Sequence, residues 1–181
     1  MFLPETRDIY VEGWGPVLYD KPIQWHQLDY LRIFGALNQH VWGDNLNDWK
    51  IYLMNFNADC QNPSGFWDGE IIFYKTVFDE GRFKYVTRDI LAEPKYLSVA
   101  WGETRFSPPL FGWNGFDSTK LKVTADDALR IAEENGGKEA RLTNKCINVS
   151  LFLLPGDSQR WEVHYKNFKI SIDPYTGEVV K

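Results

Sequence analysis

The feature that most constrains this fold is a helix in the last third of the chain whose two ends are both marked by the sequence. Thr124 can cap the helix, and Asp127 follows three residues later, an arrangement close to a capping box. Gly136 and Gly137 end it, because glycine readily takes the left-handed conformation that terminates helices. The sequence therefore predicts a helix over residues 125–137.

Short runs of alternating or β-branched residues follow this helix and are separated by turn residues. The predicted strands cover residues 145–154, 160–165, 168–172 and 178–180. In the last turn, Pro174 presets φ and Gly177 can take a positive φ. We therefore expect a helix packed on an antiparallel sheet in this third of the chain.

The longer N-terminal part repeats this order of elements and holds most of the aromatic residues, which make up 16% of the chain and include 8 Trp. An irregular arm over residues 1–24, with a short strand at 8–12, precedes a helix predicted at 23–41 from apolar residues at three- and four-residue steps. Strands are predicted at 49–56, 70–78, 82–90 and 96–101, with a hairpin turn at Gly81. Both faces of the second strand are apolar, so we expect both faces of the sheet to be covered.

The order of elements predicts an α+β fold made of two helix-on-antiparallel-sheet units. The expected division is residues 1–106 for the first unit with its extended arm, 107–118 for a linker rich in aromatic residues, proline and glycine, and 119–181 for the second unit. This internal repeat is inferred from layout, since the halves share no convincing identity. A chain of 181 residues can hold one domain or two small units that share a core.

The linker carries large apolar side chains that an unattached linker would expose to water. In one interpretation these rings form a platform that stacks a sugar or grips a peptide. In the other, which we favour, they form a hydrophobic seam between the two units. The candidate binding residues in and beside the linker are Trp101, Phe111, Trp113 and Phe116.

Composition excludes several classes of function. The net charge is −5 and no block of basic residues occurs, so neither nucleic acid nor an anionic membrane surface is an expected partner. No apolar run reaches the roughly 18 residues of a membrane span. The first residues lack the basic and apolar regions of a signal peptide. Two locations remain: the cytoplasm, or an extracytoplasmic site reached with a leader that is not part of this sequence.

The two cysteines, Cys60 and Cys146, form no metal-binding or redox motif. They lie in different halves of the chain, so a disulfide between the halves is one alternative and two unpaired buried thiols are the other. The unpaired thiols are favoured, because free cysteine packs as a small apolar residue.

Motifs for catalysis and metal binding are absent from the sequence. His26, His40 and His164 belong to no HExxH pattern, and no GxSxG nucleophile or glycine-rich phosphate loop occurs. Residues 44–48 are rich in oxygen ligands, but Leu46 and Trp49 stand where a calcium loop of the EF-hand type needs a ligand and a glycine. We therefore expect no enzyme activity, no cofactor and no bound metal.

The C-terminal third resembles the PepSY-like family. The matching stretches are the helix ADDALRIAEENGG, the strand WEVHY and the ending FKISIDPYTGEVV. The resemblance implies a cystatin-like helix on an antiparallel sheet, and a bacterial protein that is secreted or lipid-anchored. Such domains have been proposed to restrain peptidases. The family brings no catalytic residues, so none is assigned here, and the chain departs from it in its long aromatic first half and in having no attached protease domain.

Residues and resemblance together predict a non-enzymatic, extracytoplasmic binding or regulatory domain. Its partner would be a protein, such as a peptidase, recognised through a sheet edge. The alternative is a small-ligand or polysaccharide-binding module that uses exposed tryptophans.

Overall fold

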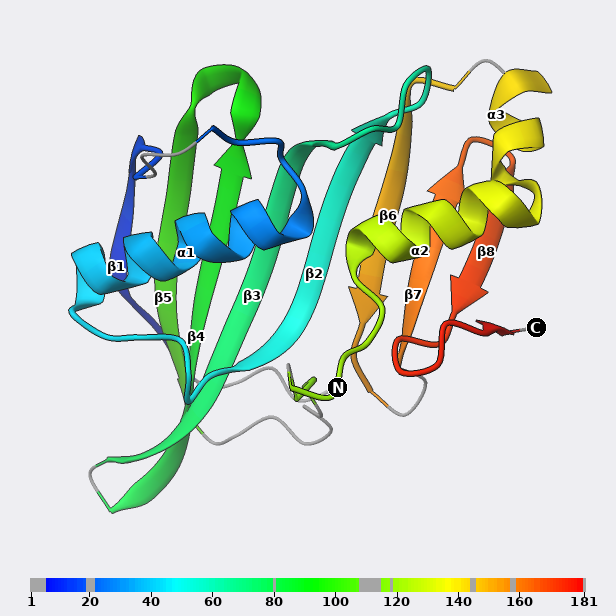
Figure 1. Cartoon of the computed structure of the whole chain (residues 1–181). Helices are drawn as coiled ribbons and strands as arrows, with labels where there is room; N and C mark the ends of the chain where they lie inside the picture. Colours follow the sequence, from blue (N-terminus) through cyan, green and yellow to red (C-terminus); the bar gives the residue numbers. More distant parts are fainter. Residues whose placement is uncertain are drawn as a thin grey trace.

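The computed structural model describes residues 6–18, 22–79, 81–107, 115–117, 119–143, 146–156 and 159–180, and its strands form one twisted sheet (Figure 1). The strands are β1 (Thr6–Pro16), β2 (Lys50–Asp59), β3 (Phe66–Asp79), β4 (Arg82–Glu93), β5 (Ser98–Ser107), β6 (Asn148–Leu154), β7 (Arg160–Tyr165), β8 (Phe168–Ile172) and β9 (Val179–Val180). The helices are α1 (Gln27–Trp42), α2 (Ala125–Ala132) and α3 (Lys138–Thr143), with a 3-10 turn at Pro94–Tyr96. None of the described helices is long and apolar enough to cross a membrane.

The nine strands have the order β1-β5-β4-β3-β2-β6-β7-β8-β9, and every neighbouring pair is antiparallel. The predicted α+β class is confirmed. The expectation of two separate helix-on-sheet units is wrong, because β2 pairs directly with β6, from Met54 opposite Leu153 to Asp59 opposite Asn148. Each of these strands follows the helix of its own half, so the strand order is symmetric about the β2–β6 pair.

The helices α1 and α2 lie end to end on the same face of the sheet (Figure 1). Tyr30 and Phe34 of α1 are fully buried there, and the Tyr30 ring meets Phe56 of β2 edge to face at 5.2 Å. The alanines of α2 let it approach β6 and β7 closely, and the Trp161 indole of β7 donates to the Val123 carbonyl at 2.9 Å. We expected both faces of the sheet to be covered, but no described helix lies on the opposite face, which we call the open face.

The two helices meet at their N-terminal ends, where each half caps the helix of the other. The Asp126 carboxylate of α2 accepts a hydrogen bond from the Gln27 amide at 3.0 Å and contacts His26 Nδ1 at 2.6 Å. In return, the Gln27 side chain accepts from the Ala125 amide at 2.5 Å. These bonds satisfy amide groups that helix starts leave unpaired, so they tie the halves together.

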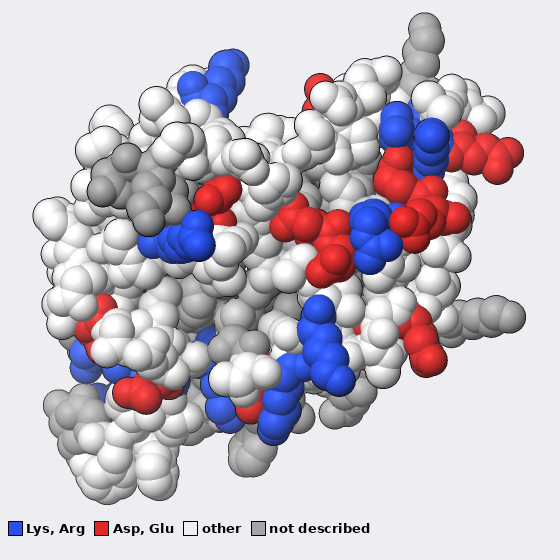
Figure 2. Space-filling view, viewed as in Figure 1, with Lys and Arg blue, Asp and Glu red and all other residues white. Residues whose placement is uncertain are grey.

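The predicted capping box of α2 is confirmed, since Asp127 N donates to Thr124 Oγ1 at 3.1 Å and Thr124 N donates to Asp127 Oδ2 at 3.2 Å. The helix breaks at Gly136, which has φ +107°, but α3 then starts at once and was not predicted. Acidic and basic side chains of α2 and α3 are intermixed on the helix face (Figure 2), and they include the Arg141–Glu133 pair at 2.8 Å.

Cys60 and Cys146 form a disulfide, so the preference for two unpaired thiols is wrong. Cys60 follows β2 and Cys146 precedes β6, and their Cα atoms lie 5.8 Å apart. The pairing of β2 with β6, which the local sequence patterns do not reveal, is what brings the two cysteines together. The bond therefore joins the halves of the chain beside the strand pair that merges their sheets.

A buried charge network holds the C-terminal end of α1 against the sheet. Arg88 of β4 donates through Nε to Glu103 of β5 at 2.9 Å and through Nη1 to Asn38 of α1 at 2.6 Å. Its guanidinium lies 4.4 Å from the centre of the Trp42 ring and 4.2 Å from that of Trp49. All donors of a buried arginine need such partners, because an unpaired buried charge is costly.

Candidate functional site

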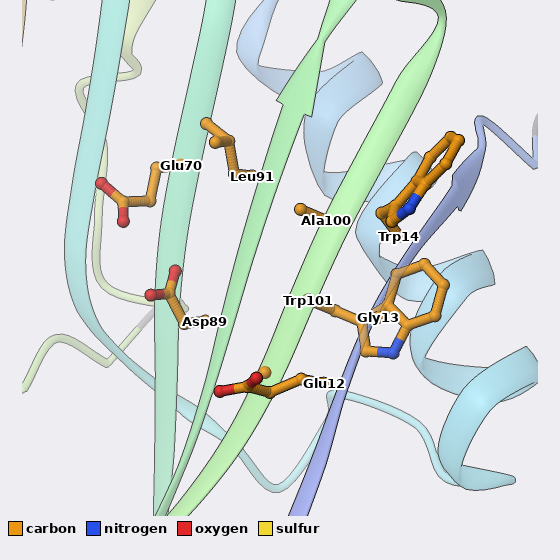
Figure 3. Close-up of a pocket in the computed structure, with 9 residues that line it drawn as sticks. Glu12, Gly13, Trp14, Glu70, Asp89, Leu91, Ala100 and Trp101 are labelled. Carbon is orange, nitrogen blue, oxygen red and sulfur yellow. The ribbon is translucent and has the colours of Figure 1, made fainter. Parts of the chain in front are cut away.

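The open face is hollowed over β1, β5, β4 and β3 by a groove of about 560 Å³ (Figure 3). It is lined by Glu12, Gly13, Trp14, Glu70, Asp89, Leu91, Ala100, Trp101 and Gly102. Small residues form part of its floor, since Ala100 lies between Trp14 and Leu91, and Gly102 lies between Glu12 and Asp89 in the strand register. Because these two residues project little from the sheet, a ligand can come close to the backbone there.

One side of the groove carries an exposed aromatic ring. Trp14 belongs to the edge strand β1, and 78% of its surface is exposed. Trp101 of β5 lies against the same strand, where a Cβ atom on Gly13 would come within 2.6 Å of Trp101 Cζ2. Gly13 therefore makes room for one indole, while the neighbouring Trp14 projects into solvent (Figure 3).

The other side of the groove carries a pair of carboxyl groups, Glu70 of β3 and Asp89 of β4 (Figure 3). The two are diagonal neighbours, because Glu70 lies opposite Leu91 and Asp89 opposite Ile72. Desolvation by the surrounding strands, then the charge of Glu70 and a hydrogen bond to it, raise the pKa of Asp89 from 3.8 to about 6. The pair therefore tends to hold one proton between its two carboxyl groups in mildly acidic solution.

This pKa shift predicts a stabilising substitution. The folded protein keeps a proton on Asp89 between the unfolded pKa of 3.8 and the folded pKa of about 6, so stability falls as the pH rises through that interval. Asp89→Asn is therefore expected to raise the free energy of unfolding at neutral pH by up to about 1 kcal/mol, a figure lowered for solvent screening. The gain should vanish below the unfolded pKa.

Urea unfolding at neutral and at acidic pH measures this effect. Glu178→Gln, which removes an exposed carboxylate in the turn before β9, is the matched control and should change stability little at either pH. A gain of the same size for Asp89→Asn at both pH values would contradict the assignment of the effect to titration of the carboxyl pair.

The four aromatic residues predicted from the sequence as binding candidates do not come together in one site. Trp101 borders the groove, but it lies opposite the buried Ile90, so its ring packs over Gly13 on the helix face. Phe116 is fully buried, and its backbone forms a bridge with Ile51 of β2, so its ring packs in the core between the halves. Phe111 and Trp113 lie outside the described residues. Of the four candidates, the structure thus places Trp101 beside the groove with its ring on the other face of the sheet, and it does not bring Phe116 there.

Sequence reasoning missed Trp14, Glu70 and Asp89. Glycines and a proline make the arm that contains Trp14 look irregular in the sequence. The glycines on either side of Trp14, Gly13 and Gly15, are nevertheless a signal that one large ring stands among small neighbours. The carboxyl pair could have been found from the β3–β4 hairpin, because counting back from the turn at Gly81 places the two acids diagonally on one face.

The other polar candidates serve as partners within the protein. His26 contacts Asp126, and His164 Nε2 lies 3.0 Å from Glu162. Asp44, in the loop tested as a calcium site, accepts from Lys75 at 3.2 Å and from Arg88 at 3.3 Å. Among the described residues, no group of His, Cys, Asp and Glu side chains is arranged to hold a metal ion.

Comparison with known proteins adds no relative: no family model, no curated protein and no solved structure matches this chain. The resemblance of the C-terminal third to the PepSY-like family therefore stays a prediction, and the function must be argued from the groove itself.

Proposed function

We propose that this protein is a non-enzymatic binding domain and that it holds a strand of polysaccharide in the groove of its open face. One observation carries the proposal: the Trp14 ring, 78% exposed, stands at the rim of a groove of about 560 Å³ whose opposite side is lined by carboxyl groups. Exposed rings of this size are costly to leave in water unless they meet a partner.

The chemistry of the groove suits a sugar chain. An indole face packs against the C–H face of a sugar ring, and carboxylates accept hydrogen bonds from its hydroxyl groups. Ala100 and Gly102 leave the space that a ring needs beside Trp14. The groove also extends to the edge strand β1, so a sugar chain could bind by an internal segment while both its ends stay outside the groove.

The geometry favours binding over hydrolysis. Retaining glycosidases hold their two carboxyl groups about 5 Å apart, and inverting enzymes hold them further apart. Glu70 and Asp89 are close enough to hydrogen-bond to each other. Two carboxyl groups that share a hydrogen bond do not flank a glycosidic bond, so we assign both residues to recognition.

An extracytoplasmic location is part of the proposal. The Cys60–Cys146 disulfide supports it, because disulfides persist in oxidising compartments and are rare in the cytosol. The resemblance of residues 125–180 to the PepSY-like family supports the same location, since many members are secreted or lipid-anchored.

Replacing Trp14 with alanine tests the proposal. We expect affinity for a panel of soluble polysaccharides, measured by affinity electrophoresis, to fall about tenfold, because a stacked aromatic ring contributes about 0.5–1.5 kcal/mol in addition to the apolar area that it buries. Trp67→Ala is the matched control: Trp67 is also exposed, at 48%, but does not line the groove. Equal retardation of both variants and the wild type would overturn the proposal.

A second candidate function rests on the edge of the sheet. β1 pairs with β5 on one side, and no described strand pairs with its other side, over the 11 residues Thr6–Pro16. Such an edge can add a strand from a partner protein, which is how a peptidase could be restrained. In that case a co-encoded peptidase would be inhibited by the wild type and by Trp14→Ala alike, whereas the polysaccharide proposal predicts no inhibition by either.

A further inference from the structure

The groove belongs to a wider acidic region of the open face. Five of the described carboxylates project from this face of β1, β3 and β4: Glu12, Asp68, Glu70, Asp89 and Glu93. Among the described side chains at open-face positions of β3, β4 and β5 there is no lysine or arginine. The described cations of these strands, such as Arg88, point to the helix face instead.

Another carboxylate of the open face, outside the groove, is surrounded by cations. On the open face of β7, Glu162 contacts Lys169 at 2.8 Å, Arg160 at 2.7 Å and His164 at 3.0 Å. Burial would raise the pKa of Glu162, but these hydrogen bonds outweigh it and lower that pKa to about 2. The protein therefore surrounds one open-face carboxylate with cations and leaves those of the groove facing one another.

The carboxylates of the groove repel one another when ionised. Glu70 faces Asp89 from β3, Glu12 lines the same groove from β1, and β5 contributes only uncharged residues to the lining. Asp68 lies next to this set, and its pKa is raised by desolvation and then by the charges of Glu93 and Glu70, against a hydrogen bond from Asn57. A positive group in the groove would relieve this repulsion and take the place of the shared proton.

The hollow and the exposed Trp14 ring are observations independent of these charges, and they place a ligand beside the carboxylates. The ring adds to the attraction, because a cation is held over the face of an indole by its quadrupole. A ligand that is both ring-shaped and cationic would satisfy the aromatic and the acidic sides of the groove together.

We infer that the ligand is a cationic saccharide, a chain of sugar rings that carry protonated amino groups. This inference rests on the proposed polysaccharide function and narrows it. The amino groups bind between Glu70 and Asp89, and a neighbouring ring stacks on Trp14. A neutral sugar lacks the charge that the carboxylate pair requires, and a basic peptide lacks the flat C–H face that suits the indole.

Two oligosaccharides of equal length that differ only in charge provide the test: an oligomer of glucosamine and the corresponding oligomer of N-acetylglucosamine. Each is titrated calorimetrically into the full chain at a pH well below the pKa of the ligand amine, so that the amine is fully protonated before it binds and takes up no further proton. We expect the glucosamine oligomer to bind at least about tenfold more tightly, since hydrogen bonds between charged partners are roughly twice as strong as neutral ones. Its binding should also weaken with added salt.

Variants of the carboxyl pair assign the effect to the groove. Glu70→Gln and Asp89→Asn should each remove most of the advantage of the charged oligomer, whereas Glu178→Gln should keep it. Binding of the charged oligomer should release protons, visible as a dependence of the apparent enthalpy on the buffer. A role of Glu70 and Asp89 in structure alone would not produce this release.

The outcomes separate the two proposals. Equal binding of the two oligomers would overturn the cationic ligand and leave the polysaccharide function standing. Binding of neither, together with no binding of other polysaccharides, would overturn both. Binding of a lysine-rich peptide in the groove, with no binding of the glucosamine oligomer, would overturn the assignment to a saccharide.

Discussion

Replacing Arg88 with methionine is expected to lower the free energy of unfolding by about 3–5 kcal/mol. Arg88 is 6% exposed and Glu103 is 5% exposed, so the substitution leaves the buried Glu103 carboxylate with only the more distant cation of Arg105, at 3.7 Å. It also removes the donor to Asn38, which anchors α1. Urea unfolding monitored by tryptophan fluorescence measures the loss.

The exposed Arg130 of α2 is the matched control. It pairs with Glu134 at 3.2 Å, with 58% of its side chain exposed, so Arg130→Met is expected to cost less than about 0.5 kcal/mol. Adding Glu103→Leu to Arg88→Met should recover much of the lost stability, because the buried charge that has lost its nearest cation is removed. If Arg88→Met were as mild as Arg130→Met, the buried network would not be what holds the end of α1 on the sheet.

Replacing both cysteines with alanine is expected to lower the free energy of unfolding by about 2–4 kcal/mol. The Cys60–Cys146 bond closes a segment of 86 residues, so it restricts the unfolded chain strongly. It also links the ends of β2 and β6, the pair that joins the two halves of the sheet. Chemical denaturation with and without a reducing agent measures the effect.

The reduced wild type is the internal comparison for this variant. It should unfold at the same denaturant concentration as the Cys60→Ala/Cys146→Ala protein, and the variant itself should not respond to the reductant. A wild type whose unfolding is insensitive to the reductant would show that the sheet pairing, and not the bond, holds the halves together.

The elements controlled by local chemistry could be predicted from the sequence. The start of α2 followed from Thr124 and Asp127, and the last turn followed from Gly177, which has φ +81°. In both cases the residues that decide the structure lie within a few positions of one another, so their pattern is visible in the chain. The α+β class followed for the same reason.

The single sheet could not be predicted in this way. It depends on the pairing of β2 with β6, which are about 90 residues apart in the chain. The alternation of apolar and polar residues along a strand does not show which other strand it will pair with. The two-unit expectation and the preference for unpaired thiols at Cys60 and Cys146 failed together, because both depended on that one pairing.

Only part of the candidate site could be predicted from the sequence. The sequence indicates Trp101, whose ring lies on the helix face, whereas the exposed ring of the groove is Trp14, in a segment that the sequence predicts to be an irregular arm. Glycine is needed at position 13 because the Trp101 ring occupies the space that a side chain there would take. That contact forms only when β1 pairs with β5, so the sequence alone does not reveal it. The acidic side of the groove likewise arises from strand register.

If the groove between Trp14 and the Glu70–Asp89 pair binds a cationic saccharide, nuclear magnetic resonance will locate the bound ligand there. Backbone amide shifts of the wild-type protein are followed while a glucosamine oligomer is added. We expect the shift changes to be concentrated in Glu12–Trp14, around Glu70 and Asp89, and at Ala100–Gly102, with the amides of α2 unchanged. Shifts confined to the helix face, or no shifts with any amino-sugar oligomer, would contradict this expectation.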